Sequence, residues 1–224
     1  MNYNIRHIIY CFIFLLSLLA CRNENKVSGD DSVMMEIDLG LSVKWANMNI
    51  GASKPEEFGN YYALGCVTPF DSVPIYLEYP TDEEWHDSVG VVLPKYDAAC
   101  YYTNNTWRIP TYEEWTELTD KCKWQWGNYN GVEGYFVEGP NGNSIFLPAA
   151  GNTESKYGDA SNGGYRCSYV WDGGATFSLY FIKPQNASSP KISSELDALE
   201  QADVFWSPYG CQVPASIRAV KVEQ

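Results

Sequence analysis

Histidine is nearly absent from this sequence, which contains only His7 and His86. His7 precedes a long apolar run at the N-terminus, so His86 is the one histidine left for a folded domain. A histidine-based catalytic triad or a histidine-rich metal site would depend on that single side chain. Seven cysteines are present, but no Cys-x-x-Cys pair has the spacing of a metal site. We therefore expect no enzyme activity, no metal site and no cofactor.

Positive charge is also scarce, with 15 basic residues against 28 acidic ones and a net charge of −13 at pH 7. A surface with this balance repels nucleic acid and sulfated or sialylated polymers unless a local basic patch overrides it. The sequence contains no such patch. Nucleic acid is therefore not an expected partner.

A single long hydrophobic run extends from Ile8 to Leu19, after a short segment that carries Arg6. The run is too short to span a bilayer as a mature helix and is typical of a signal peptide. It ends Leu-Leu-Ala-Cys at Cys21, which resembles the lipobox of bacterial lipoproteins, where the cysteine becomes the N-terminus and carries acyl chains such as palmitate. An ordinary secretory signal with a coincidental cysteine and an uncleaved anchor are the alternatives.

These features divide the chain into a lipoprotein signal peptide (residues 1–20), a polar lipidated tether (residues 21–35) and one domain (residues 36–224). Loss of residues 1–20 removes the positive charge of Arg6 and changes the net charge from −13 to −14. Residue 22 is Arg rather than Asp, so the inner-membrane retention signal of some bacterial lipoproteins is absent. We expect an outer-membrane lipoprotein, and the sequence is compatible with surface exposure.

Alternating apolar residues predict a half-buried strand over residues 37–45, with Gly40 inside it. An Asn-Gly turn predicts a hairpin at residues 139–143. Residues 66–95 keep neither the helical nor the strand period and are predicted to form a long surface excursion. Further short strand patterns lie at residues 61–64, 122–126, 132–138, 144–147, 177–182 and 216–222. The sequence therefore predicts antiparallel strands separated by long loops.

The stretch TWRIPTYEEW, residues 106–115, predicts the start of a helix. Thr111 followed three residues later by Glu114 forms a capping box, and apolar residues then recur at helical spacing. Glu113 and Glu114 lie in the first turn, where negative charge is favourable to the helix dipole. We interpret the adjacent carboxylates as helix-stabilising groups rather than as a catalytic pair.

Five segments of the chain carry a family resemblance: residues 37–46 (IDLGLSVKWA), 59–63 (GNYYA), 107–111 (WRIPT), 139–151 (GPNGNSIFLPAAG) and 216–220 (SIRAV). Together they resemble the Fibrobacter succinogenes major paralogous domain family, over nearly the whole of residues 36–224. The resemblance implies an α+β, C-type-lectin-like domain with a small antiparallel or mixed sheet, one or two helices and long loops. It implies no reaction.

The resemblance also raises two kinds of site that the residues do not support. Calcium-dependent lectins use Glu-Pro-Asn and Trp-Asn-Asp motifs, which are missing here. Formylglycine-generating enzymes of the same broad superfamily use paired cysteines near the C-terminus, but the surroundings of Cys167 and Cys211 do not match. Residues 66–95, 170–174 and 210–215 depart from the family pattern, so the ligand of this chain can differ from that of its relatives.

Five cysteines follow the lipidation site, and their pairing stays open. An exported chain permits disulfides, but an odd number leaves at least one thiol unpaired within a monomer. The five are Cys66, Cys100, Cys122, Cys167 and Cys211.

Aromatic side chains are the strongest binding signal in the sequence. Trp171 and Trp206 lie in glycine- or proline-rich surroundings, with Tyr165 nearby in sequence. Exposed rings can stack on the apolar faces of sugars, and Asp172 could accept hydrogen bonds from hydroxyl groups. The predicted ligand-binding residues are therefore Tyr165, Trp171, Asp172 and Trp206. The alternative is that these rings form a second core.

Asp-Ser-Val occurs three times, at residues 31–33, 71–73 and 87–89. Each copy resembles the Asp-Ser/Thr-aliphatic sequon for O-glycosylation of exported bacterial proteins. All three lie in segments expected to be exposed, so Ser32, Ser72 and Ser88 are the candidate modification sites.

Taken together, these features predict a lipid-anchored, non-catalytic binding module for a glycan or a surface protein. The alternative is a structural component of an envelope or fimbria-like assembly, bound through its edges and loops. The first hypothesis predicts an exposed aromatic cluster around Trp171 and Trp206. The second predicts that those rings are buried and that an apolar patch or an open strand edge lies elsewhere.

Overall fold

The computed structural model describes residues 33–70, 85–151, 162–171, 175–186, 190–193, 202–210 and 213–223. Every described element belongs to one compact unit, residues 33–224. The predicted signal peptide, Cys21, Ser32 and Ser72 lie outside the described residues. None of the helices in the described part of the chain is long and apolar enough to cross a membrane.

The architecture is mostly β, with three small sheets, two short α-helices and loops among the described residues. Helix α2 spans Ala98–Tyr102, helix α3 spans Tyr112–Lys121, and a 3-10 turn, η1, spans Pro94–Tyr96. The strands are β1 (Glu36–Ile37), β2 (Trp45–Ala46), β3 (Tyr61–Tyr62), β4 (Trp107–Arg108), β5 (Lys123–Tyr129), β6 (Val132–Glu138), β7 (Ser144–Pro148), β8 (Asn162–Trp171), β9 (Ala175–Ile182), β10 (Val204–Gly210), β11 (Ala215–Ser216) and β12 (Val220–Lys221).

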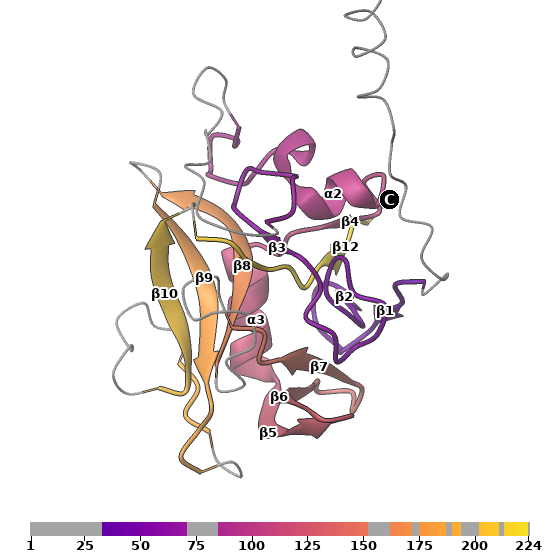
Figure 1. Cartoon of the computed structure of the whole chain (residues 1–224), viewed down its shortest axis with the longest axis vertical. Helices are drawn as coiled ribbons and strands as arrows, with labels where there is room; N and C mark the ends of the chain where they lie inside the picture. The colour runs from indigo at the N-terminus through magenta and orange to yellow at the C-terminus, as the bar shows by residue number, and fades with distance from the viewer. Residues whose placement is uncertain are drawn as a thin grey trace, which may run out of the picture. The chain divides into compact units, whose positions relative to one another are not determined.

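The strands form a four-stranded sheet in the order β1-β2-β12-β4, a five-stranded sheet in the order β10-β9-β8-β11-β3, and a three-stranded sheet in the order β5-β6-β7 (Figure 1). Pairing between these strands is antiparallel except between β8 and β11. The expected small sheets, short helices and loops are therefore present, within a chain that is richer in strand than an α+β class implies.

The segment 37–45 is not the single strand that its alternation predicts. It forms two short antiparallel strands, β1 and β2, because Gly40 adopts a left-handed φ of 75° and the Asp38 side chain accepts a hydrogen bond from the Gly40 N–H at 2.7 Å. The side chains of Asn141 and Asn143 each donate to the Asp38 carbonyl oxygen at 2.8 Å. The β1–β2 loop is therefore held against the hairpin that joins β6 to β7.

Helix α3 begins where the capping box predicts. The Thr111 hydroxyl accepts from the Glu114 N–H at 3.4 Å, and the Glu114 carboxylate accepts from the Thr111 N–H at 2.9 Å. Trp115 and Leu118 lie on the buried face of the helix, and the Trp115 indole N–H donates to the Arg166 carbonyl oxygen at 3.0 Å. The prediction of a capped helix is confirmed.

Strands β5, β6 and β7 form the predicted meander. Asn130 and Gly131 both have positive φ, at 51° and 91°, and make the two-residue turn between β5 and β6. The predicted hairpin at residues 139–143 joins β6 to β7, with Gly142 at a φ of 86°. Trp124 and Trp126 point from β5 into the core, whereas Lys123 and Gln125 are exposed.

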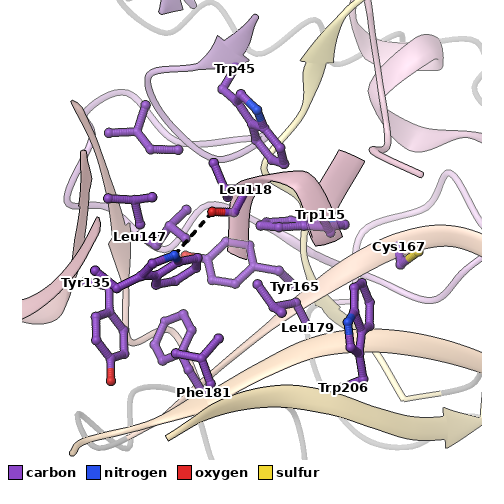
Figure 2. Packing of buried hydrophobic residues seen from close by; sticks show 14 of the residues in the cluster. Trp45, Trp115, Leu118, Tyr135, Leu147, Tyr165, Cys167, Leu179, Phe181 and Trp206 are labelled. Carbon is purple, nitrogen blue, oxygen red and sulfur yellow. Dashed lines mark hydrogen bonds between the residues drawn. The ribbon is translucent and has the colours of Figure 1, made fainter. Parts of the chain in front are cut away.

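Two hydrophobic cores lie within the unit. In the larger one, Trp115 and Leu118 of α3 pack between the inner faces of the three-stranded and five-stranded sheets (Figure 2). The smaller core lies beneath α2 and includes Tyr62, Ala98, Ala99, Trp107 and Ile217. Helix α3 therefore connects two sheets that do not pair with each other.

Arg218 is fully buried beside the larger core and ties three segments together. Its Nε donates to the Asn49 side-chain oxygen at 2.9 Å, and its two Nη atoms donate to the carbonyl oxygens of Ala46 at 3.1 Å and Phe146 at 2.8 Å. No described carboxylate pairs with it. Burial lowers the pKa of Arg218 to about 10, so the side chain is charged at neutral pH. Its role is structural.

Candidate functional site

Two of the four predicted ligand-binding residues are buried rather than exposed. The side chains of Tyr165 and Trp206 are both 0% exposed, and Trp206 packs against Leu179 and Cys167 in the larger core (Figure 2). The Tyr165 hydroxyl donates to the Pro148 carbonyl oxygen at 2.9 Å. These rings face inward because β8 and β10 turn their core-facing side chains toward α3. The expectation that they stack on a sugar is therefore corrected.

The other two predicted ligand-binding residues are not placed by the structure. Asp172 and the side chain of Trp171 lie outside what the structure describes. The backbone of Trp171 is described and pairs with Ala175 at the end of β8. An aromatic site around Trp171 therefore stays a prediction.

The Glu114 carboxylate in the first turn of α3 has structural partners. Both Nη atoms of Arg108 donate to the Glu114 carboxylate, one of them at 2.7 Å, and the same carboxylate closes the capping box. The paired hydrogen bond from Glu114 raises the pKa of Arg108. Glu114 is thus engaged by a bidentate arginine and by the helix N-terminus, which supports its interpretation as scaffolding.

Three of the described thiols, those of Cys100, Cys122 and Cys167, have raised pKa values because they are buried. Cys66, Cys100, Cys122 and Cys167 are all free of disulfides, and Cys211 lies outside the described residues. Burial raises the pKa of Cys100 to about 12 and that of Cys122 to about 11. Burial and the charges of Glu113 and Glu114 raise the pKa of Cys167 well above its ordinary value. A thiolate nucleophile is therefore not available at neutral pH at these three positions.

Ser88 is the one candidate modification site that the structure describes, and it is exposed at the tip of a tight turn. The Asp87 carboxylate accepts from the N–H groups of Val89 at 3.0 Å and Val91 at 2.9 Å, and the Gly90 N–H donates to the Asp87 carbonyl oxygen at 3.1 Å. No group of three or more metal-ligating side chains comes together among the described residues.

Among the residues that the structure describes, the most exposed pair of aromatic rings lies on helix α2. Tyr101 is 59% exposed and Tyr102 is 48% exposed, and their ring centroids lie 5.1 Å apart at an interplanar angle of 83°. The Tyr102 ring also lies 5.9 Å from the ring of buried Tyr62, whose hydroxyl accepts from the Asn60 amide at 3.3 Å. The two exposed rings thus form a corner that rests on a buried aromatic ring.

Helix α2 is short, but the buried carboxylate of Asp97 fixes its N-terminal end. The buried Asp97 carboxylate accepts from the Cys100 N–H at 3.1 Å and from the Ile109 N–H at 2.8 Å, which caps the helix and ties it to the segment after β4. At the other end, Asn104 and Asn105 both have positive φ and turn the chain away from the helix. Tyr101 and Tyr102 therefore project from a fixed platform.

Tyr102 lies beside Tyr101 and Cys66. Burial raises the pKa of Tyr102, and these two neighbours raise it further. Next to Cys66, a Cβ atom at Gly65 would lie 2.9 Å from Cε3 of Trp85, so the partly buried Trp85 ring packs on this loop. We call Asn60, Cys66, Trp85, Tyr101 and Tyr102 the α2 surface. Its aromatic rings and neutral polar groups suit an uncharged ligand.

The sequence analysis did not single out Tyr101 and Tyr102. A signal was present, because Asp97 precedes two alanines and the adjacent tyrosines. Asp is a favoured N-cap residue and marks the start of a helix here, but spacing alone does not decide which side chains of a five-residue helix are exposed. Residues 66–95 were interpreted as a loop, and the residues that follow show no long helical pattern. Helix α2 was therefore not predicted.

Comparison of the chain with protein-family models, with curated proteins and with solved structures finds no match.

Proposed function

We propose that this chain is a lipid-anchored binding module of the bacterial outer membrane, that it is not an enzyme, and that it binds a neutral glycan through the α2 surface. The observation that carries the proposal is the exposed Tyr101–Tyr102 pair on a capped helix, packed on the buried Tyr62 ring. Aromatic faces stack on the apolar faces of sugar rings, and neutral amides and hydroxyls bind sugar hydroxyls. A net charge of −13 disfavours acidic polysaccharides.

Two features of the sequence support the proposal: the predicted lipid anchor and the resemblance to a family of binding domains. The lipobox-like end of the signal peptide predicts acylation at Cys21, and the residues that follow, 22–32, are mostly polar, as expected of a tether. Within the mostly-β architecture, we propose a C-type-lectin-like domain, on the basis of the resemblance in sequence. Such domains place ligands on loops and short connections, and α2 lies in one of these connections.

The test uses residues 33–224, because this unit contains both hydrophobic cores and every described element. The soluble unit is applied to an array of neutral and acidic glycans, in calcium and in chelator. We expect binding to neutral glycans that is the same in both buffers, since the described residues contain no cluster of metal ligands.

The variants Tyr101→Ala and Tyr102→Ala test the site directly. We expect each to weaken binding by about 1.4 kcal/mol or more, a tenfold rise in Kd. Ile182→Ala is the control, because Ile182 is an exposed apolar side chain at the end of β9, outside both the α2 surface and the β5 edge. Binding that survives both α2 variants and is lost on Trp171→Ala would move the site back to the end of β8. A blank array with folded protein would refute glycan binding.

A structural role in an envelope or fimbria-like assembly is the second candidate function. The observation that favours it is the burial of Tyr165 and Trp206 together with an open strand edge on another sheet. Glycan binding at α2 and assembly through a strand edge use different surfaces, so the array and a measurement of mass in solution separate them.

A further inference from the structure

The outer edge of β5 is long and regular. β5 pairs with β6 through all seven residues without a register shift, and Tyr129 lies opposite Val132 at the two-residue turn. Alternate residues of an antiparallel strand direct their peptide groups to opposite sides. The peptide groups of Glu133 on β6 and of Gly139 just after it bond toward β7, so the even-numbered residues between them bond toward β5.

This register decides which peptide groups of β5 face outward. Gln125 and Gly127 bond to β6, and Trp124, Trp126 and Asn128 direct their N–H and C=O groups away from the sheet. No backbone hydrogen bond joins these three residues to any other described residue. The indole N–H of Trp126, a residue only 6% exposed, also has no partner among the described residues.

The other long edges are blocked. On β7, the outward carbonyl oxygens of Phe146 and Pro148 accept from Arg218 at 2.8 Å and from the Tyr165 hydroxyl at 2.9 Å. On β10, the Val204 N–H donates outward to the Lys191 carbonyl oxygen at 3.1 Å, so the even-numbered residues face away from β9. Pro208 is one of them and has no N–H to offer.

β5 carries little of the protection that exposed strand edges normally have. Its sequence, KWQWGNY, contains no proline, no bulge and one charge, Lys123, at its first position. Tryptophan and tyrosine also favour the strand conformation. An edge of this kind is a template for another strand. A partner strand is therefore the physical expectation at this edge.

We propose that two copies of this chain pair antiparallel through β5, about a two-fold axis at Trp126, and form one continuous sheet from β7 of one copy to β7 of the other. The strand is self-complementary in this register. Trp126 lies opposite its own counterpart and Trp124 lies opposite Asn128, so every outward peptide group of the two strands finds a partner. The proposal rests on no part of the glycan-binding assignment.

The side chains also favour a second copy over an unrelated strand. In this register Gln125 lies opposite Gly127, and Lys123 lies opposite Tyr129, where an ammonium group can approach an aromatic face. No like charges face each other. The two Lys123 side chains lie at opposite ends of the paired strands, roughly 20 Å apart, which exceeds the Debye length of about 8 Å at physiological salt.

Sedimentation equilibrium on residues 33–224 is the first test. We expect a mass twice that of the single unit, with dissociation on dilution. Amide hydrogen exchange then identifies the interface: protection of Trp124, Trp126 and Asn128 rises with protein concentration, while protection of Gln125 and Gly127 does not change. A monomer at every concentration, or a dimer in which these three amides exchange as fast as in the monomer, would overturn the proposal.

Substitutions at Asn128 isolate the outward N–H group. Asn128→Pro and Asn128→Ala both lose the side-chain acceptor for the Gly131 N–H, but only the proline removes the outward donor and places a ring at the edge. We expect Asn128→Ala to dimerise and Asn128→Pro to be a folded monomer. Pro208 in β10 is a precedent within the chain for proline at an outward strand position.

A second pair of variants keeps the test decisive if the proline disturbs the hairpin. Gln125 is exposed, and in the paired sheet the two Gln125 side chains are diagonal neighbours. Gln125→Glu places two like charges there, whereas Gln125→Thr adds no charge and favours a strand. We expect the glutamate variant to dimerise more weakly than the threonine variant. Equal dissociation constants for the two would contradict pairing in this register.

Discussion

Replacing Arg218 with methionine removes the hydrogen bonds that connect it to β2, to the Asn49 loop and to β7. Methionine keeps much of the buried volume but leaves the Asn49 side-chain oxygen and the Ala46 and Phe146 carbonyl oxygens without their donor. Each stranded buried acceptor costs about 1–3 kcal/mol. Removal of a buried, unpaired charge offsets part of this cost. We therefore expect a net loss of about 4 kcal/mol in the free energy of unfolding.

A loss of this size is a large part of the roughly 5–15 kcal/mol that stabilises a typical domain. It corresponds to a fall in Tm of roughly 8–16 °C for a domain of this length. Urea unfolding of residues 33–224, followed by tryptophan fluorescence, measures the change at an unaltered m value. Arg218→Lys retains the charge and reaches fewer acceptors, so it is expected to fall between methionine and the native residue.

The control is Lys221→Met, because Lys221 is a partly exposed cation three residues further along the same segment, and its ammonium group lies over the Trp107 ring. It is expected to cost about 0.5–1 kcal/mol. A double-mutant cycle between Arg218→Met and Asn49→Ala should give a coupling energy of about 1 kcal/mol or more. If Arg218→Met unfolds within about 1 kcal/mol of the native chain, the reasoning from stranded acceptors is refuted.

Three further predictions concern local features. Thr111→Ala removes the helix cap and should lower the free energy of unfolding by about 1 kcal/mol, whereas Thr111→Ser should change it little; equal urea midpoints for the alanine variant and the native chain would contradict the cap. Burial raises the folded-state pKa of Asp97 above its unfolded value of 3.8, so its contribution to stability is fully present below that value and is lost as the pH rises through the folded-state pKa. The difference in unfolding free energy between the native chain and Asp97→Asn should therefore fall as the pH rises from 3.8 through the folded-state pKa, and stay constant above it. A difference that rises with pH would contradict a raised pKa of Asp97. Ser88, exposed on its turn, should carry a hexose-sized addition in peptide mass spectra of the lipoprotein from its natural host, absent in Ser88→Ala; an unmodified native peptide would remove Ser88 from the candidates.

Features that depend on a few neighbouring residues were predictable from the sequence. The capping box at Thr111 and Glu114, the 139–143 hairpin and the alternation of Trp124 and Trp126 with polar residues all appear in the structure. In each case the signal and the hydrogen bonds that realise it lie within a few positions of each other. The alternating burial of residues 37–45 also appears, although Gly40 breaks the strand into two.

The aromatic site was predicted in part incorrectly, because burial depends on contacts between distant segments. Trp206 and Tyr165 lie in loop-like sequence surroundings, yet β8, β9 and β10 pair and turn these rings toward α3. Tyr101 and Tyr102 have no outstanding sequence context, yet the short helix that buries Ala98 and Ala99 leaves both rings exposed. The aromatic rings predicted to be exposed are thus buried, and exposed rings lie where none was predicted.

The sequence by itself determined the acidic balance, the capped helix and the hairpins, because these follow from composition and from short-range hydrogen bonding. Only the tertiary structure decided which aromatic rings face solvent, that Arg218 is a buried cross-link, and that β5 is left with an open edge. These properties depend on which strands pair and which faces pack, and strand pairing is set by residues far apart in the chain.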